Sequence, residues 1–242
     1  PRRDMSAFTS YDYAHRGLWG GEVPDNSLPA FDRAATGGYG IELDVHLTRD
    51  DVLVVFHDDT PDRVCGVSGR VDEKSLAELK ALRLGASSET IPTLDEVLAV
   101  VGGRVPMIVE VKSDKRLDEL CAHLHERMLT YDGAWVMESF NPMAVRWFRK
   151  HEPARIRGQL SFGLRDQKHT LLNLCCSGLV TQFLTRPDFV ARDEKSATGL
   201  GMAWMRLLRP WFVAWTVRSP ERMAELRKTF DVQIFEGFLP KS

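Results

Sequence analysis

The stretch that decides the fold runs from residue 40 to residue 58 and reads GIELDVHLTRDDVLVVFHD. Two apolar runs flank the polar triplet Arg49-Asp50-Asp51, which predicts a strand, a turn and a returning strand. Glu42 and Asp44 share one face because they lie two apart, and the hairpin places Asp44 opposite His57. Two carboxylates and an imidazole suit a metal site with a neighbouring proton carrier. A polar outer face on an exposed hairpin is the alternative.

Apolar runs that suit buried parallel strands alternate with helical patterns along the chain. Besides the returning arm Leu53–His57, we expect eight such strands: Asp12–His15, Gly40–Val45, Met107–Val111, Trp135–Ser139, Ile156–Leu160, Leu179–Phe183, Phe212–Thr216 and Val232–Glu236. Eight parallel strands joined by helices predict an α/β fold, a closed (β/α)8 TIM barrel. An open doubly wound sheet is the alternative, but no glycine-rich turn follows the first strand. We expect residues 1–242 to form a single barrel domain.

Capping residues predict where several helices begin. Capping boxes start at Ser75 and Thr93, and Asn141 and Ser219 each precede a proline at the first helical position. The residues at about 58–91 exceed what a simple connection needs, which predicts a small insertion after the second-strand hairpin. We expect this insertion to wall a pocket, and a packing ornament is the alternative.

The composition argues against several classes of partner. A net charge of −2 gives no global attraction to nucleic acid or to an anionic membrane. The sequence has no run of about eighteen apolar residues that would predict a membrane span. Its basic start lacks the apolar core of a signal peptide. The four cysteines form no Cys-x-x-Cys pair, so we expect reduced thiols in a cytoplasmic protein.

Acidic, basic and imidazole side chains gather at the ends of the first three predicted barrel strands. The residues concerned are His15, Arg16, Glu42, Asp44, Glu110 and Lys112. The carboxyl ends of strands form the functional face of a (β/α)8 barrel, so we expect them to share a cleft. Three carboxylates there require compensation, and their oxygen ligands favour Ca²⁺ or Mg²⁺ over zinc.

With one divalent cation bound, the remaining charges make the cleft positive. Arg16 supplies directional donors and Lys112 a mobile point charge, which together suit a phosphate diester anion. His15 and His57 can act as acid and base at neutral pH. For either histidine alone, a structural hydrogen-bonding role is the alternative.

An ordered series of motifs spans nearly the whole chain, from about Tyr13 to Pro240. It comprises His15-Arg16-Gly17, Asn26-Ser27 with Phe31, Glu42-x-Asp44, His57-Asp58, Ile91-Pro92-Thr93-Leu94, Glu110-x-Lys112, Ser139-Phe140 and Trp215-Thr216-Val217. This series closely resembles the glycerophosphodiester phosphodiesterase family, whose phosphatidylinositol-phosphodiesterase-like TIM barrel has a small insertion after the His-Asp pair. The resemblance therefore implies the same fold as the strand pattern.

The resemblance implies metal-dependent hydrolysis of glycerophosphodiesters to sn-glycerol 3-phosphate and an alcohol. Attack by the glycerol 2-hydroxyl, through a cyclic phosphate, and direct attack by water are both compatible with the sequence. Asn26 is interpreted as a helix cap, and holding the loop near His15 is the alternative. Packing in the core is the alternative for Phe140. The implied roles are cation binding by Glu42, Asp44 and Glu110, acid–base catalysis by His15 and His57, phosphate binding by Arg16 and Lys112, and lining of the pocket by Phe140 and Trp215.

The late loops depart from the family pattern. Arg218 stands where many relatives carry Asn, and Glu236 ends the last strand, so the two either compensate each other or Arg218 contacts substrate. The segment Arg186–Leu208 is hard to match. The alternative functions are a phospholipase D-like lyase acting on lysolipids or sphingolipids, a glycosidase and a binding module. We expect a small-molecule substrate, no nucleic acid and no stable membrane insertion; a homodimer is compatible with the sequence.

Overall fold

The computed structural model describes residues 3–112, 115–161, 181–196 and 210–240. The chain folds into two compact units, residues 14–135 and residues 1–13 with 136–242. Each unit is described by itself. Within the described residues, no helix is both long enough and apolar enough to cross a lipid bilayer.

The unit of residues 14–135 is built on β2. Its strands are β1 (Tyr13–His15), which starts at the boundary, β2 (Gly40–Leu47), β3 (Leu53–Val55) and β4 (Met107–Val111). Its helices are α2 (Leu28–Thr36), α3 (Asp62–Cys65), η1 (Val71–Glu73), α4 (Leu76–Lys80), α5 (Leu94–Val101) and α6 (Leu117–Met128). β2 is buried throughout, pairs in parallel with β4 and antiparallel with β3, and also pairs with β1.

The β2–β3 hairpin has a register one residue away from the predicted one. Val45 pairs with Val55, and the N–H of Phe56 donates to the carbonyl oxygen of Asp44 at 3.0 Å. Asp44 therefore lies opposite Phe56, and the prediction that it lies opposite His57 was wrong. The turn closes symmetrically about Asp50, and His57 follows the end of the strand, outside its two-residue alternation.

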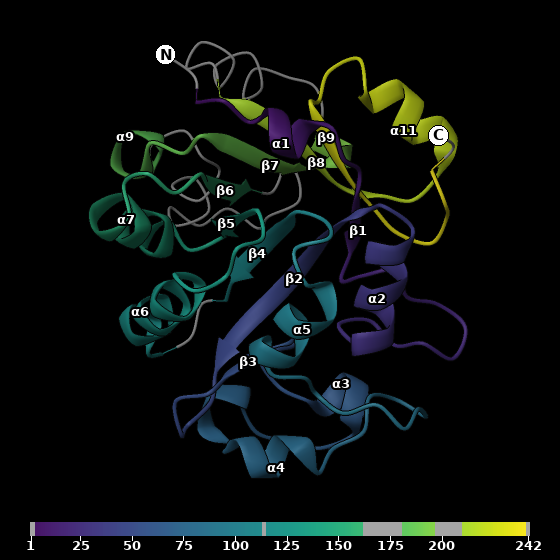
Figure 1. The fold of residues 1–242 in the computed structure, drawn as a ribbon, viewed down its shortest axis with the longest axis vertical. Helices are drawn as coiled ribbons and strands as arrows, with labels where there is room; N and C mark the ends of the chain where they lie inside the picture. Colours follow the sequence, from purple (N-terminus) through teal and green to yellow (C-terminus); the bar gives the residue numbers. More distant parts are fainter. Residues whose placement is uncertain (1–2, 113–114, 162–180, 197–209, 241–242) are drawn as a thin grey trace. The chain divides into compact units, whose positions relative to one another are not determined.

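The segment 58–91 packs on this hairpin through a small core of its own. The buried members of this core are Val54, Phe56, Val71, Leu79, Leu84 and Ile91. The capping boxes predicted at Ser75 and Thr93 are both present and start α4 and α5. α3 and α4 lie beyond β3 in this unit (Figure 1). The last part of the segment, residues 84–89, lines a cavity of about 720 Å³ together with residues 21–24 and Pro29.

The second unit carries consecutive parallel strands. They are β5 (Trp135–Ser139), which starts at the boundary, β6 (Arg157–Ser161), β7 (Phe189–Asp193), β8 (Trp211–Val217) and β9 (Val232–Phe235), each paired with the next. Its helices are α1 (Ser6–Thr9), α7 (Pro142–His151), α9 (Thr181–Thr185), η2 (Glu194–Ser196) and α11 (Pro220–Leu226). The predicted N-caps Asn141 and Ser219 start α7 and α11.

The strand predicted at Leu179–Phe183 is wrong. Residues 181–183 belong to α9, and residues 179–180 lie outside the described part of the chain. The strand between β6 and β8 is instead β7, whose Phe189 is fully buried. Gly158 on β6 makes room for it, because a Cβ there would lie 2.1 Å from the Phe189 ring. A short apolar run does not by itself distinguish a strand from a buried helix.

Candidate active site

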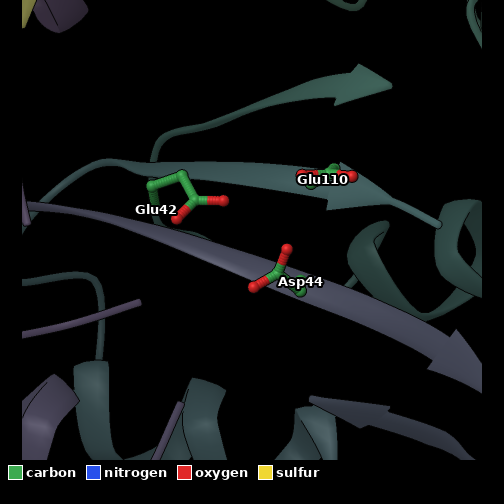
Figure 2. A group of neighbouring side chains, drawn as sticks. All are labelled: Glu42, Asp44 and Glu110. Carbon is green, nitrogen blue, oxygen red and sulfur yellow. The ribbon is translucent and has the colours of Figure 1, made fainter. Parts of the chain in front are cut away.

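Three buried carboxylates converge at the β2–β4 pair. Glu42 and Asp44 extend from β2 and Glu110 from β4 (Figure 2). One oxygen from each carboxylate lies within 4.8 Å of the others, and all three side chains are buried. The parallel register pairs Asp44 with Glu110, and the two-residue alternation brings Glu42 to the same face. The structure thus brings together the three residues predicted as cation ligands.

Lys112, one residue beyond β4, neutralises part of this charge. Its Nζ lies 2.7 Å from Oδ1 of Asp44 and 2.8 Å from Oε1 of Glu110. Burial favours the neutral amine, but these two carboxylates outweigh it and raise the pKa of Lys112 above its ordinary value.

The two carboxylates that contact Lys112 respond differently to burial. For Asp44, burial is opposed by Lys112, His57 and Arg16, which hold its pKa well below the usual range. Burial raises the pKa of Glu110; Lys112 opposes this shift and Asp44 adds to it. Glu110 is therefore the less fully compensated carboxylate, and the cluster favours additional positive charge.

Arg16 contacts the same cluster through its backbone and its side chain. Its N–H donates to Oε2 of Glu42 at 3.0 Å. Its guanidinium pairs with Asp25 at 3.0 Å, and its Nε lies 3.7 Å from Oδ2 of Asp44. Asp25 was not among the predicted site residues, and no motif indicated its role. The guanidinium thus lies beside the carboxylates, where an oxyanion could also reach it.

Asn26 is a further site residue whose role was misread from the sequence. The residue is 2% exposed, and its Nδ2 donates to Oδ2 of Asp44 at 2.8 Å. The cap of α2 is Ser27, whose hydroxyl accepts from the N–H of Ala30, so the interpretation of Asn26 as the cap was wrong. Both residues are common N-caps, and the sequence gives no local signal that distinguishes them.

The two histidines have different surroundings. Nδ1 of His57 lies 2.6 Å from Oδ1 of Asp58, which Arg63 on α3 holds through two hydrogen bonds. Burial lowers the pKa of His57; Asp44 and Asp58 oppose this, and nearby cations add to it. Nε2 of His15 lies 3.9 Å from Oε2 of Glu42. Sequence reasoning placed Asp58 in a motif but assigned no role to Arg63.

The remaining predicted site residues, Phe140 and Trp215, belong to the unit of residues 136–242. Their rings meet edge to face, with centroids 5.6 Å apart. In the same unit, Nε of Arg218 lies 3.1 Å from Oε1 of Glu236. The interpretation that these two residues compensate each other is confirmed.

The donor set suits a hard divalent cation. Glu42, Asp44 and Glu110 supply oxygen ligands, which Ca²⁺ and Mg²⁺ prefer. Three carboxylates meet one ammonium, while the guanidinium of Arg16 is shared with Asp25. This imbalance leaves the cluster negative, and a bound cation would offset it.

Comparisons with known proteins identify the family of this chain. Residues 15–230 match the model of the Glycerophosphoryl diester phosphodiesterase family. The chain belongs to this family. A glycerophosphodiester phosphodiesterase of Caldanaerobacter subterraneus is 35% identical over 230 residues, which cover 89% of this chain and 88% of that protein. A putative glycerophosphodiester phosphodiesterase of Bacillus subtilis is 34% identical over 90% of each.

Solved structures of family members establish the fold class. A phosphodiesterase of Oleispira antarctica, solved with the product sn-glycerol-3-phosphate, matches with a TM-score of 0.78 at 24% identity over 93% of this chain and 92% of that one. A putative family member from Silicibacter pomeroyi matches with a TM-score of 0.76 at 22% identity over 93% and 89%. The (β/α)8 barrel predicted for this chain is confirmed. As a member of the family, the chain is a phosphoric diester hydrolase.

Proposed function

We propose that the protein hydrolyses glycerophosphodiesters to sn-glycerol 3-phosphate and an alcohol with the help of one divalent cation, Ca²⁺ or Mg²⁺. The observation that carries the proposal is the convergence of Glu42, Asp44 and Glu110 within 4.8 Å in a member of this family. These three residues would hold the cation. The names of the relatives state this activity, and the product bound to the Oleispira antarctica protein is consistent with it.

A cation held there would polarise a phosphoryl oxygen and offset negative charge in the transition state. Arg16 and Lys112 bind the phosphate anion in this proposal. The guanidinium supplies directional donors, and the ammonium supplies a point charge on a flexible stem. The ammonium stays protonated at neutral pH, because Asp44 and Glu110 raise the pKa of Lys112. Phe140 and Trp215, in the unit of residues 136–242, are proposed to contact the substrate.

The histidines move the protons. Nδ1–H of His57 donates to Asp58, so Nε2 keeps a lone pair that can accept a proton. Because burial lowers its pKa, His57 is neutral at neutral pH and suits the role of base. When water attacks directly, His57 takes its proton as the new P–O bond forms. When the glycerol 2-hydroxyl attacks first, His57 takes that proton and a cyclic phosphate forms. In either case His15 protonates the leaving alkoxide as the old P–O bond breaks. Water then opens the cyclic phosphate in a second step, in which His15 takes the proton of the water and His57 returns its proton to the 2-oxygen.

The direct test measures release of sn-glycerol 3-phosphate from glycerophosphocholine and glycerophosphoethanolamine. Chelation with EDTA should abolish activity, and added Ca²⁺ or Mg²⁺ should restore it. Glu110→Gln should lose at least about 100-fold in kcat, because it removes a ligand charge. Glu119→Gln on α6 is the matched control, since Glu119 is exposed and pairs with Arg116. Activity that survives chelation would contradict the cation, and cleavage of lysolipids alone would favour the lyase.

The domain organisation, location and assembly also stay predictions. We propose that the two units are parts of a single barrel domain, because the family match runs through both. Single-transition unfolding followed by two probes would support this. A cytoplasmic location and a homodimer are testable by cell fractionation and by sedimentation.

A further inference from the structure

The two carboxylates of β2 are both held by one loop, residues 16–26. The backbone N–H of Arg16 donates to Oε2 of Glu42 at 3.0 Å. The side-chain amide of Asn26 donates to Oδ2 of Asp44 at 2.8 Å, and both side chains in this second bond are buried. The two ends of the loop therefore reach two of the three residues that, in the proposed function, hold the cation.

The loop is closed on itself and on α2. The N–H of Asn26 donates to the carbonyl oxygen of Arg16 at 3.0 Å, and the two residues have φ of +51° and +58°. Gly17 between them has φ of +82°, and a Cβ there would lie 2.8 Å from the carbonyl carbon of Ala30. The N–H of Leu18 donates to the carbonyl oxygen of Ala30 at 2.9 Å. These contacts hold the N–H of Arg16 and the side-chain amide of Asn26 in position in the absence of any ligand.

The amide of Asn26 has one orientation that fits its surroundings. An amide oxygen at 2.8 Å from a carboxylate oxygen would be repelled, so the NH₂ end faces Asp44. The other end, Oδ1, is buried and has no hydrogen-bond partner among the described residues. A buried amide oxygen without a hydrogen-bond partner destabilises the folded state. The side-chain amide of Asn26 therefore keeps its hydrogen bond to Asp44 although its buried oxygen lowers the stability of the fold.

The two oxygens of Asp44 are consequently distinguished. Oδ2 accepts from Asn26, while Oδ1 lies 2.7 Å from Nζ of Lys112, which also contacts Glu110. We propose that Asn26 is a positioning residue for the cation site: its amide fixes Oδ2 of Asp44 so that Oδ1 faces Glu110 and is presented to the cation. This inference rests on the proposed function, because it concerns the ligand that Asp44 supplies.

The test measures dissociation constants for Ca²⁺, Mg²⁺ and Mn²⁺ by calorimetry on the full chain, without substrate. Asn26→Gly removes the amide and still allows the left-handed backbone, whereas Asn26→Ala also strains that backbone. Both variants should bind cations about 10–100-fold more weakly, as for other groups that orient metal ligands. Asp51→Gly is the matched control, because Asp51 has φ of +65° in the hairpin turn and its side chain pairs with Arg116. It should bind as wild type.

A second readout separates positioning from mere folding. The side-chain NH₂ of Asn26, assigned in ¹H–¹⁵N spectra by its loss in Asn26→Gly, should show a protected proton that shifts on addition of Ca²⁺. The inference would be overturned if Asn26→Gly bound cations with wild-type affinity, or if the chemical shift of the Asn26 side-chain NH₂ did not change on addition of Ca²⁺. Wild-type protein that binds no cation would instead overturn the proposed function.

Discussion

Lys112→Met should destabilise the protein strongly when no divalent cation is bound. The change keeps the length of the apolar stem and removes the ammonium that contacts Asp44 at 2.7 Å and Glu110 at 2.8 Å. All three side chains are at most 10% exposed. Removing one partner of a buried ion pair costs about 3–5 kcal/mol, because the remaining charge stays buried and uncompensated. We expect a loss of this size in the free energy of unfolding.

Urea denaturation in EDTA at pH 7 measures this loss. The matched control is Lys80→Met, which breaks an ion pair to Glu96 whose side chains are 30% and 43% exposed. That variant should lose less than about 1 kcal/mol. Adding a divalent cation at 100 times its dissociation constant should return about 2.7 kcal/mol to Lys112→Met.

The pH dependence gives the sign of the effect. In wild type, the lowered pKa of Asp44 contributes stability above pH 3.8 that is lost as the pH falls. The raised pKa of Glu110 has the opposite sign and removes some stability as the pH rises above 4.5, an effect that Lys112 limits. In Lys112→Met, the buried carboxylates favour their neutral forms, so stability in EDTA should decrease as the pH rises from about 4 to 7. A Lys112→Met protein that matches Lys80→Met in EDTA, or that shows the wild-type pH slope, would refute this electrostatic account.

Three further changes have expected outcomes. Asp58→Asn should lower kcat by about 100-fold and shift the acidic limb of the pH–rate profile to lower pH, because the Asp58 hydrogen bond raises the pKa of His57. An acidic limb at the wild-type pH would contradict the pairing of His57 with Asp58. Gly17→Ala should cost about 1–3 kcal/mol in thermal unfolding, because it strains a φ of +82° and brings a Cβ against Ala30; wild-type stability would exclude this strain. Arg218→Ala should change stability by less than about 1 kcal/mol, since that side chain is 62% exposed, and a larger loss would indicate a structural role.

The carboxylate cluster was predictable because its geometry follows from simple periodicities. Alternation puts Glu42 and Asp44 on one face of β2, and parallel pairing with β4 brings Glu110 beside Asp44. The starts of α4 and α5 were equally accessible, since each capping box is a local signal. Local rules predict these features without knowledge of distant contacts.

The errors arose where two local signals compete. Asn26 and Ser27 are both good N-caps, and the contact of Asn26 with Asp44 decides between them from a distance in sequence. Two apolar runs competed for the strand after β6, and close packing of Phe189 on Gly158 fits the second. The observed hairpin register differs by one residue from the predicted register, so His57 does not pair with Asp44 across the two strands.

His57, the proposed proton carrier, and the carboxylates are held by different parts of the chain. His57 is held through Asp58 by Arg63, which belongs to α3 within the segment 58–91, whereas Glu42 and Asp44 are tied to strand β2 and the loop 16–26. Under the proposed function, mutations in α3 would therefore change the pH dependence of the enzyme and leave its preference among cations unchanged. A protein engineer could exploit the same separation, evolving one property by randomising α3 and leaving the strand residues untouched.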